Sequence, residues 1–189
     1  RYRTVFLTAP CDYAPEALEA LRAFVDAGGT LVATADALSR DGALALADVM
    51  GVECLGPSVF STTHFLLDPD VAGASDAMPL QMRGRSHMVV PTAARALARL
   101  IEPEVEPTSA YSFRNEQCAP PSRRPSRFPF ICENAYGSGR AVLIAGPLFS
   151  TYWRTNHHWL RQTVEGLHAY LEPKPLFRVD APPVVEANL

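Results

Sequence analysis

One cluster of aromatic and basic side chains near residue 155 is best suited to bind a ligand. Its members are Tyr152, Trp153, Arg154, His157, His158 and Trp159. Aromatic rings stack on sugars, and Arg and His can hydrogen-bond hydroxyl or carboxylate groups. The cluster follows the last expected strand and opens the last expected helix, at the edge where open α/β sheets bind ligands. Two other readings stay open: Trp153 and Trp159 fill the space between helix and sheet while His157 caps the helix, or the cluster contacts another domain or subunit.

A catalytic nucleophile is expected on a sharp turn between a strand and a helix, because such a turn exposes the side chain beside helix N–H groups. The position after residues 30–35 holds Asp36, flanked by Thr34 and Ser39. Neither GxSxG nor GxCxG is present there, and no close glycine permits the strained turn. Cys11 also follows a strand, but it lacks a neighbouring base. We therefore predict no catalytic residue in this chain and interpret Asp36 as a degenerate nucleophile position.

The remaining polar groups do not form a familiar cofactor or metal site. GSGR at 137–140 precedes an expected strand, whereas phosphate-binding loops follow a strand and open a helix. The acidic residues at 68–70 and 102–106 lie in proline-containing loops, where solvation explains them. The four cysteines, whose spacing includes no CxxC, are Cys11, Cys54, Cys118 and Cys132. We expect no metal and no cofactor; reduced thiols are favoured, although two disulfides with three alternative pairings stay open.

Composition narrows the class of protein further. The chain has 189 residues, of which 48% are apolar and 20% charged, and a formal net charge of -3. These values describe a soluble globular domain without the cationic excess that attracts phosphates or anionic lipids. No apolar run approaches the roughly 20 residues that span a bilayer. We therefore expect no nucleic-acid or membrane partner, and a soluble protein of the bacterial cytoplasm.

The elements that must position these side chains are clearest at the start of the chain. Residues 4–9 form an apolar, β-branched run typical of a strand covered on both faces. A helical pattern follows from Asp12, a candidate cap, to the glycines at 28 and 29, and a second apolar run covers 30–35. Strand, helix and strand predict a right-handed βαβ unit with two parallel strands.

The later pattern is more mixed. Residues 43–51 predict a short helix, 53–90 short strands and long loops, 92–103 a further helix, and the proline-rich stretch 103–129 a solvated excursion. Two apolar runs around the glycines at 137 and 139 predict a hairpin. The last helix carries apolar residues at spacings of one turn, namely Leu160, Val164, Leu167 and Leu171, and ends before Pro173.

Three segments resemble one known family. They are VFLTAPCDYAPEALEALRAFVDAGGTLVATADALS, ALADVMGVECLG and NAYGSGRAVLIAGPLFSTYWRTNHHWLRQTVEGLHAYL. Together they resemble the class I glutamine-amidotransferase-like domain of bacterial glycoside hydrolases, often called the β-galactosidase trimerisation domain. The resemblance implies an α/β, flavodoxin-like three-layer sandwich over residues 1–174, with a largely parallel central sheet and a C-terminal hairpin plus helix. FRVDAPPVVEANL resembles the start of a following β-sandwich, so 175–189 is expected to be an extended tail.

The same resemblance implies a function. Such domains usually lack the amidotransferase nucleophile, serve subunit association and line the cleft of a neighbouring TIM barrel, which carries the catalytic carboxylates. We therefore expect a non-catalytic accessory domain of a glycoside hydrolase, with a second copy or a TIM-barrel domain of the same parent chain as partner, and carbohydrate as a candidate ligand. The alternatives are a stand-alone hydrolase or amidotransferase relative using Cys11 or the region from Tyr152 to His157, and a sugar-binding module with Trp153 as platform.

Overall fold

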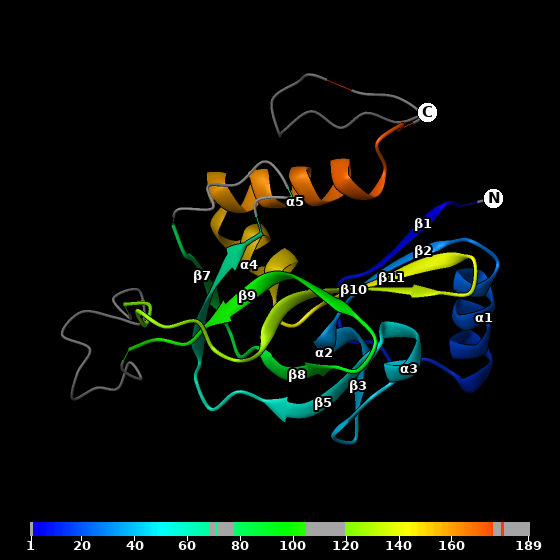
Figure 1. Ribbon diagram of the computed structural model, residues 1–189, viewed down its shortest axis with the longest axis horizontal. Coiled ribbons are helices and arrows are strands. Elements are labelled where there is room, and N and C mark those ends of the chain that lie inside the picture. The colour runs from blue at the N-terminus through cyan, green and yellow to red at the C-terminus, as the bar shows by residue number, and fades with distance from the viewer. Residues whose placement is uncertain (1, 69–70, 72–77, 105–119, 176–178, 180–189) are drawn as a thin grey trace.

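A seven-stranded mixed sheet runs through the molecule (Figure 1). The computed structural model describes residues 2–68, 71, 78–104, 120–175 and 179. In spatial order the strands are β1 (Thr4–Leu7), β2 (Thr30–Thr34), β11 (Gly139–Ile144), β10 (Pro129–Tyr136), β9 (Arg95–Ile101), β6 (Thr62–Leu67) and β7 (Leu80–Arg83). Two small two-stranded sheets accompany it: β3 (Ser39–Arg40) with β4 (Ala43–Leu44), and β5 (Val52–Pro57) with β8 (His87–Pro91).

The predicted βαβ unit is present. β1 pairs with β2 in parallel, and α1 (Pro15–Asp26) connects them. Pro15 opens this helix, where its missing N–H costs nothing. Ala14, and not Asp12, is the N-cap residue, and no side chain caps the helix. β1 is an edge strand with Phe6 exposed, so the expectation that both its faces are covered was wrong.

The sheet is not largely parallel, which corrects the expectation for its topology. Only the pairs of β2 with β1 and β11 are parallel among the described strands, whereas β11–β10, β10–β9, β9–β6 and β6–β7 are antiparallel. Part of the reason is β9, which occupies the segment predicted as a helix over 92–103. Leu97, Ala98 and Leu100 are all buried, so both faces of this strand are covered and the period of two is hidden.

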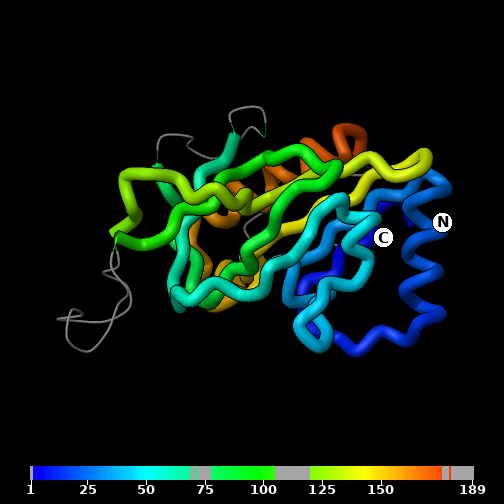
Figure 2. The backbone as a smooth tube through the Cα atoms, turned by 60° about the horizontal axis from the view of Figure 1, so that its bottom comes forward, coloured from blue at the N-terminus to red at the C-terminus, as the bar shows by residue number. Residues whose placement is uncertain are grey.

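Helices cover both faces of the sheet. Neighbouring residues of a strand point to opposite faces. On β10, Glu133 contacts Tyr170 of α5 (His158–Leu171), whereas the side chain of Asn134 donates to the carbonyl of Val49 in α3 (Ala47–Met50). α3 therefore lies on one face and α5 on the other. Figures 1 and 2 show α1 beside β2 and β11, away from α5.

The sheet curls so that both of its edges reach α4 (Leu148–Thr155). Phe6 of the edge strand β1 meets Phe149 edge to face, with ring centroids 6.2 Å apart. At the opposite edge, the hydroxyl of Thr151 donates to the carbonyl of Arg83 in β7 over 3.3 Å. α4 thus bridges the two ends of one sheet.

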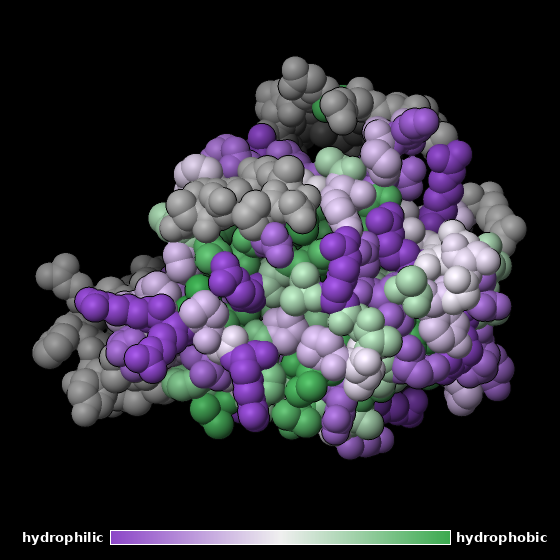
Figure 3. Space-filling model, in the orientation of Figure 1, coloured by the Kyte–Doolittle hydropathy of each residue, from purple (hydrophilic) through white to green (hydrophobic). Residues whose placement is uncertain are grey.

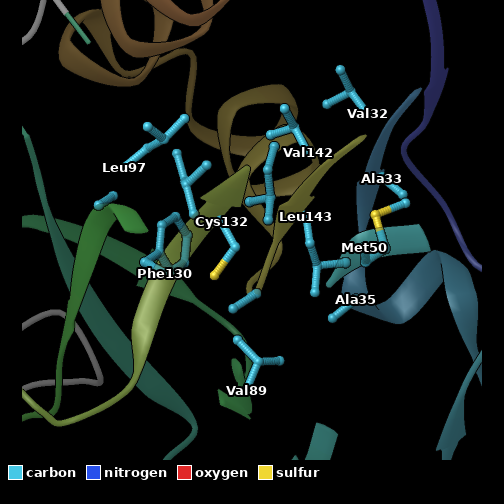
Figure 4. Packing of buried hydrophobic residues seen from close by; sticks show 14 of the residues in the cluster. Val32, Ala33, Ala35, Met50, Val89, Leu97, Phe130, Cys132, Val142 and Leu143 are labelled. Carbon is cyan, nitrogen blue, oxygen red and sulfur yellow. The ribbon is translucent and has the colours of Figure 1, made fainter. Parts of the chain in front are cut away.

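The core is centred on β10 and its neighbours (Figure 4). Phe130 of β10 and Phe65 of β6 are both fully buried, and their rings stack with centroids 4.4 Å apart. Leu97 and Cys132 lie near Phe130, and Leu143 lies beyond Cys132 in the same cluster. The predicted inward face of the last helix is confirmed for Leu160, Leu167 and Leu171, which are buried, while Val164 is partly buried.

The C-terminal hairpin and helix also match the prediction. β10 and β11 form an antiparallel pair around Gly137, whose φ of 55° is the left-handed conformation that the turn requires. Asn156, with φ of 47°, separates α4 from α5. The tail expected over 175–189 lies almost entirely outside the described residues. No helix in the described part of the chain is both long and apolar enough to cross a membrane.

The middle of the chain agrees with the predicted pattern in outline. FSTTHFLL contains β6, and SHMVV contains all of β8 except Pro91. The predicted helix over 43–51 is shorter than expected, because residues 43 and 44 form β4 and only α3 is helical. Gly51 closes α3 with φ of 67°, as a C-terminal glycine should.

Candidate functional site

The carboxyl end of β2 brings three polar side chains together. The Oγ1 of Thr34 accepts a hydrogen bond from the N–H of Ala37, and this cap turns the chain into α2 (Ala35–Leu38), which carries Asp36. β3 follows at once and presents Ser39. His87 comes from β8, where its backbone N–H donates to the carbonyl of Ala145 over 2.7 Å. That bond fixes His87 beside the end of β11.

These three side chains form a chain of polar contacts. Oγ of Ser39 lies 3.1 Å from Nε2 of His87, and Nδ1 of His87 lies 3.4 Å from Oδ1 of Asp36. The His87 side chain is only 9% exposed and that of Asp36 41%, whereas Ser39 is at the surface. The contact of Asp36 with Nδ1 is an ion-pair distance and not an aligned hydrogen bond, because buried Nδ1 has no hydrogen-bond partner. The order hydroxyl, imidazole and carboxylate is the order that activates a serine in hydrolases.

The aromatic cluster predicted near residue 155 spans the end of α4 and the start of α5. Trp153 is 83% exposed, so it does not fill the space between a helix and the sheet, whereas Trp159 is half-buried and packs against the core; that reading was therefore wrong for Trp153 alone. Trp153 follows Phe149 by one helical turn, which places both rings on one side of α4. Phe149 in turn contacts Phe6, which is 39% exposed. We call Phe6, Phe149 and Trp153 the aromatic surface.

The other residues of that predicted cluster point elsewhere. His157 is the N-cap residue of α5, as the cap reading predicts, although its side chain makes no capping hydrogen bond. Instead, His157 lines a cavity of about 120 Å³ with Thr151 and Arg83. Arg154 is exposed and Tyr152 half-buried on the last turns of α4. The lining of this cavity thus includes His157 but not Trp153.

A second group of exposed apolar side chains lies away from α4. Its members are Leu55, Val59 and Val90, on or next to the small sheet of β5 and β8. Figure 3 shows hydrophobic residues at the lower edge of one face, where Figure 1 places β5. Much of the rest of that face is hydrophilic.

A third site, missed by the sequence analysis, surrounds Glu133. Its carboxylate accepts hydrogen bonds from Nε of Arg95 at 2.9 Å, Nη1 of Arg140 at 3.3 Å and the hydroxyl of Tyr170 at 2.9 Å. Burial, and then the hydrogen bond to Glu133, raise the pKa of Tyr170 above its ordinary value. The group lines a cavity of about 480 Å³ and ties α5 to the sheet. In the sequence these residues are up to 75 positions apart, so no local pattern marks them.

The cysteines and acidic residues are the groups that could bind a metal ion. Cys11, Cys54 and Cys132 are free, and Cys118 lies outside the described residues. Burial raises the pKa of the Cys132 thiol to about 12, which makes it unreactive near neutral pH. Among the described residues, no group of three or more His, Cys, Asp or Glu side chains could hold a metal ion. Asp70 and Glu106 of the predicted solvated acidic loops also lie outside the described part.

Comparisons with known proteins identify related structures but no sequence family. No family model matches the chain, and no curated protein matches it in sequence. α-L-Fucosidase isoenzyme 2 from Paenibacillus thiaminolyticus matches with a TM-score of 0.71 and 22% identity, over 92% of this chain and 25% of that chain. A β-galactosidase from Bacillus circulans sp. alkalophilus matches with a TM-score of 0.60 and 15% identity, over 95% and 24%.

A smaller protein shares the fold as well. A cytoplasmic protein from Salmonella typhimurium LT2 matches with a TM-score of 0.57 and 14% identity, over 89% of this chain and 71% of that chain. The chain thus spans about a quarter of the length of the first glycoside hydrolases that it matches. At these identities the likeness is one of fold.

Proposed function

We propose that this chain is an accessory domain of a carbohydrate-active glycoside hydrolase, non-catalytic toward glycosidic bonds. The observation that carries the proposal is the alignment of 92% of this chain with only 25% of a fucosidase. A segment of that size is a domain beside a larger enzyme. The finer assignment, a flavodoxin-like domain of the glutamine-amidotransferase-like, trimerisation type, belongs to the same proposal and rests on the sequence resemblance.

The aromatic surface is the proposed contact with a catalytic TIM-barrel domain. Trp153 exposes 83% of its surface, and Phe6 lies on the unpaired edge strand of the sheet. Exposed aromatic groups of this kind are enriched at the centres of protein interfaces. We assign a catalytic domain as the occupant because about three quarters of the matched hydrolase chains lie outside the aligned part. A second copy of this chain is the competing occupant.

Activity assays test the non-catalytic part. Residues 1–189 are expected to leave nitrophenyl galactosides, fucosides and mannosides intact at any pH from 5 to 8, because glycoside hydrolysis needs two carboxylates facing each other across the sugar, and the proposal assigns that pair to the catalytic barrel. Hydrolysis by the purified chain would overturn the proposal.

Domain docking is tested in the parent enzyme by Trp153→Ala. We expect the variant to lower the unfolding temperature of the parent enzyme and to speed proteolysis between the domains, since the indole no longer buries its surface. Val59→Ala is the matched control, because Val59 is 75% exposed but lies away from the aromatic surface. Equal effects of the two variants would contradict docking here. Concentration-dependent sedimentation of residues 1–189, abolished by Trp153→Ala, would assign the surface to a second copy instead.

Sugar binding is a second candidate function, favoured by the exposure of the Trp153 ring. A pyranose stacked on this indole would change its fluorescence. Titration with galacto- and manno-oligosaccharides, compared with Trp153→Ala, therefore tests this function. No change in fluorescence at millimolar sugar would exclude it.

A further inference from the structure

Ser39, His87 and Asp36 form an acyl-transfer site: we propose that Ser39 is a reactive serine that His87 and Asp36 activate toward esters of short acyl groups. The residues differ from those of the aromatic surface, so the inference stands apart from the proposed function. It also revises the expectation that the turn after β2 holds no nucleophile. That expectation named Ser39 only as a residue flanking Asp36, whereas the reactive atom inferred here is the Oγ of Ser39.

The atoms are in the order that this chemistry needs. Nε2 of His87, 3.1 Å from Oγ of Ser39, can accept the hydroxyl proton when Nδ1 carries the ring proton. Nδ1 lies 3.4 Å from Oδ1 of Asp36, an ion-pair distance, and has no hydrogen-bond partner among the described residues. The carboxylate therefore favours this tautomer and stabilises the imidazolium that forms during attack. Such contacts are often loose without a substrate, and they shorten in the reacting complex.

The three side chains differ in burial: His87 is buried, Asp36 is partly exposed and Ser39 is exposed. The backbone of His87 is held in the small sheet of β5 and β8 and by the bond to Ala145, and its side chain is buried. Ser39 is exposed on the β3–β4 hairpin, and the two cavities described above are lined by other residues. An open nucleophile suits a short acyl ester that projects from a larger molecule, such as an acetylated carbohydrate. The site also lies at the carboxyl end of β2, the edge that binds ligands in open α/β sheets.

The reaction balances without any cofactor. As Oγ of Ser39 bonds to the carbonyl carbon, its proton moves to Nε2 of His87. The bond from that carbon to the alcohol oxygen breaks, and the leaving oxygen takes the proton from Nε2. Water then attacks the acyl-serine, giving one proton to Nε2, which returns it to Oγ of Ser39. The products are a carboxylic acid and an alcohol.

A fluorophosphonate probe and 4-nitrophenyl acetate test the inference on residues 1–189. We expect one phosphonyl group per chain, mapped to Ser39 by mass spectrometry, and its loss in Ser39→Ala. Ser138→Ala, which removes an exposed serine in the β10–β11 turn, is the matched control and should label normally. Labelling at a different residue, or no labelling of the unaltered chain, would overturn the inference.

The role of the relay is tested by Asp36→Asn. Asp36 is half-exposed, so this variant should keep the fold, which circular dichroism would verify. We expect its rate of phosphonylation and of acetate release to fall by about tenfold or more, because the carboxylate no longer holds the imidazole in the productive tautomer. An unchanged rate in a folded Asp36→Asn chain would show that no relay operates. Glycoside assays on the same preparations keep this result separate from the proposed accessory role.

Discussion

Tyr170 shows how one residue couples the sheet to a helix. Its hydroxyl donates to Glu133, which also accepts hydrogen bonds from Arg95 and Arg140. The Glu133 side chain is only 10% exposed, so its charge depends on these partners. Tyr170 is thus the contribution of α5 to a polar group otherwise built by β9, β10 and β11.

The raised pKa of Tyr170 predicts a loss of stability at alkaline pH. Burial and the bond to Glu133 raise it above 10.0, so the folded chain holds this proton more strongly than the unfolded chain. The contribution is fully present below pH 10 and is lost as pH rises through the folded pKa. Compared with Tyr170→Phe, the unaltered chain should be more stable by about 1 kcal/mol at pH 8, and this difference should shrink above pH 10.

Urea unfolding of both chains at pH 8, 9.5 and 11 measures this effect. The difference between the chains is the relevant quantity, because the other tyrosines titrate in both. A difference that stays constant to pH 11 would show that Tyr170 does not donate to Glu133 in the folded state.

The candidate relay marks the limit of sequence reasoning at the residue scale. Asp36 could be placed after a buried strand, because the apolar run 30–35 and its flanking glycines are local signals. His87 could not be paired with it, since 48 positions separate Ser39 from His87 and the intervening chain shows only weak strand patterns. Tertiary packing alone brings them together.

Among the elements, the contact between α1 and the β10–β11 hairpin depends on glycine. A Cβ on Gly139 would overlap the carbonyl oxygens of Val25 and Gly29, although its φ is not in the left-handed region. Gly42 is the converse case: its φ is 82° in the β3–β4 turn, but no atom lies within 4 Å of an added Cβ. Substituting Gly139 would test steric overlap alone, and substituting Gly42 would test backbone strain alone.

Gly139→Ala should therefore destabilise the fold more than Gly42→Ala. We expect losses of about 3 kcal/mol for the first, since backbone atoms must shift, and about 1 kcal/mol for the second, from the left-handed conformation alone. Chemical denaturation of both variants measures the two losses. Equal losses, or the reverse order, would contradict the close packing of α1 on the hairpin.

Helices and strands were predicted correctly where local sequence signals agree. They were predicted wrongly where pairing within the sheet determines the structure. Pro15 and the glycines at 28 and 29 bound α1, and Gly137 marks the hairpin. The segment 92–103 has helical spacing and alanine content, yet Ala96 and Ala98 pair with β10. β9 pairs with strands on both of its edges and buries Leu97, Leu100 and Ile101, and helix propensity, which amounts to tenths of a kcal/mol per residue, does not outweigh that burial.

At the scale of the whole molecule, β10 lies between the part of the sheet that contains the parallel strands and the part that is entirely antiparallel. On one side it pairs with β11, which continues into the parallel strands β2 and β1; on the other it pairs with β9, which continues into β6 and β7. The order of the strands could not be foreseen, because β11 inserts next to β2 from more than a hundred positions away. A central strand of this kind should make the two halves unfold together.

Phe130→Ala tests this cooperativity. Phe130 is fully buried on β10 and stacks on Phe65 of β6, so its loss should cost about 4 kcal/mol. Because β10 holds both halves, unfolding followed by tryptophan fluorescence, which reports α4 and α5, and by far-ultraviolet circular dichroism should still coincide in a single transition. Phe6→Ala, at the exposed edge, is the matched control and should cost about 1 kcal/mol. Two separate transitions in the Phe130→Ala chain would show that the parallel and antiparallel parts are independent folding units joined only by a shared strand.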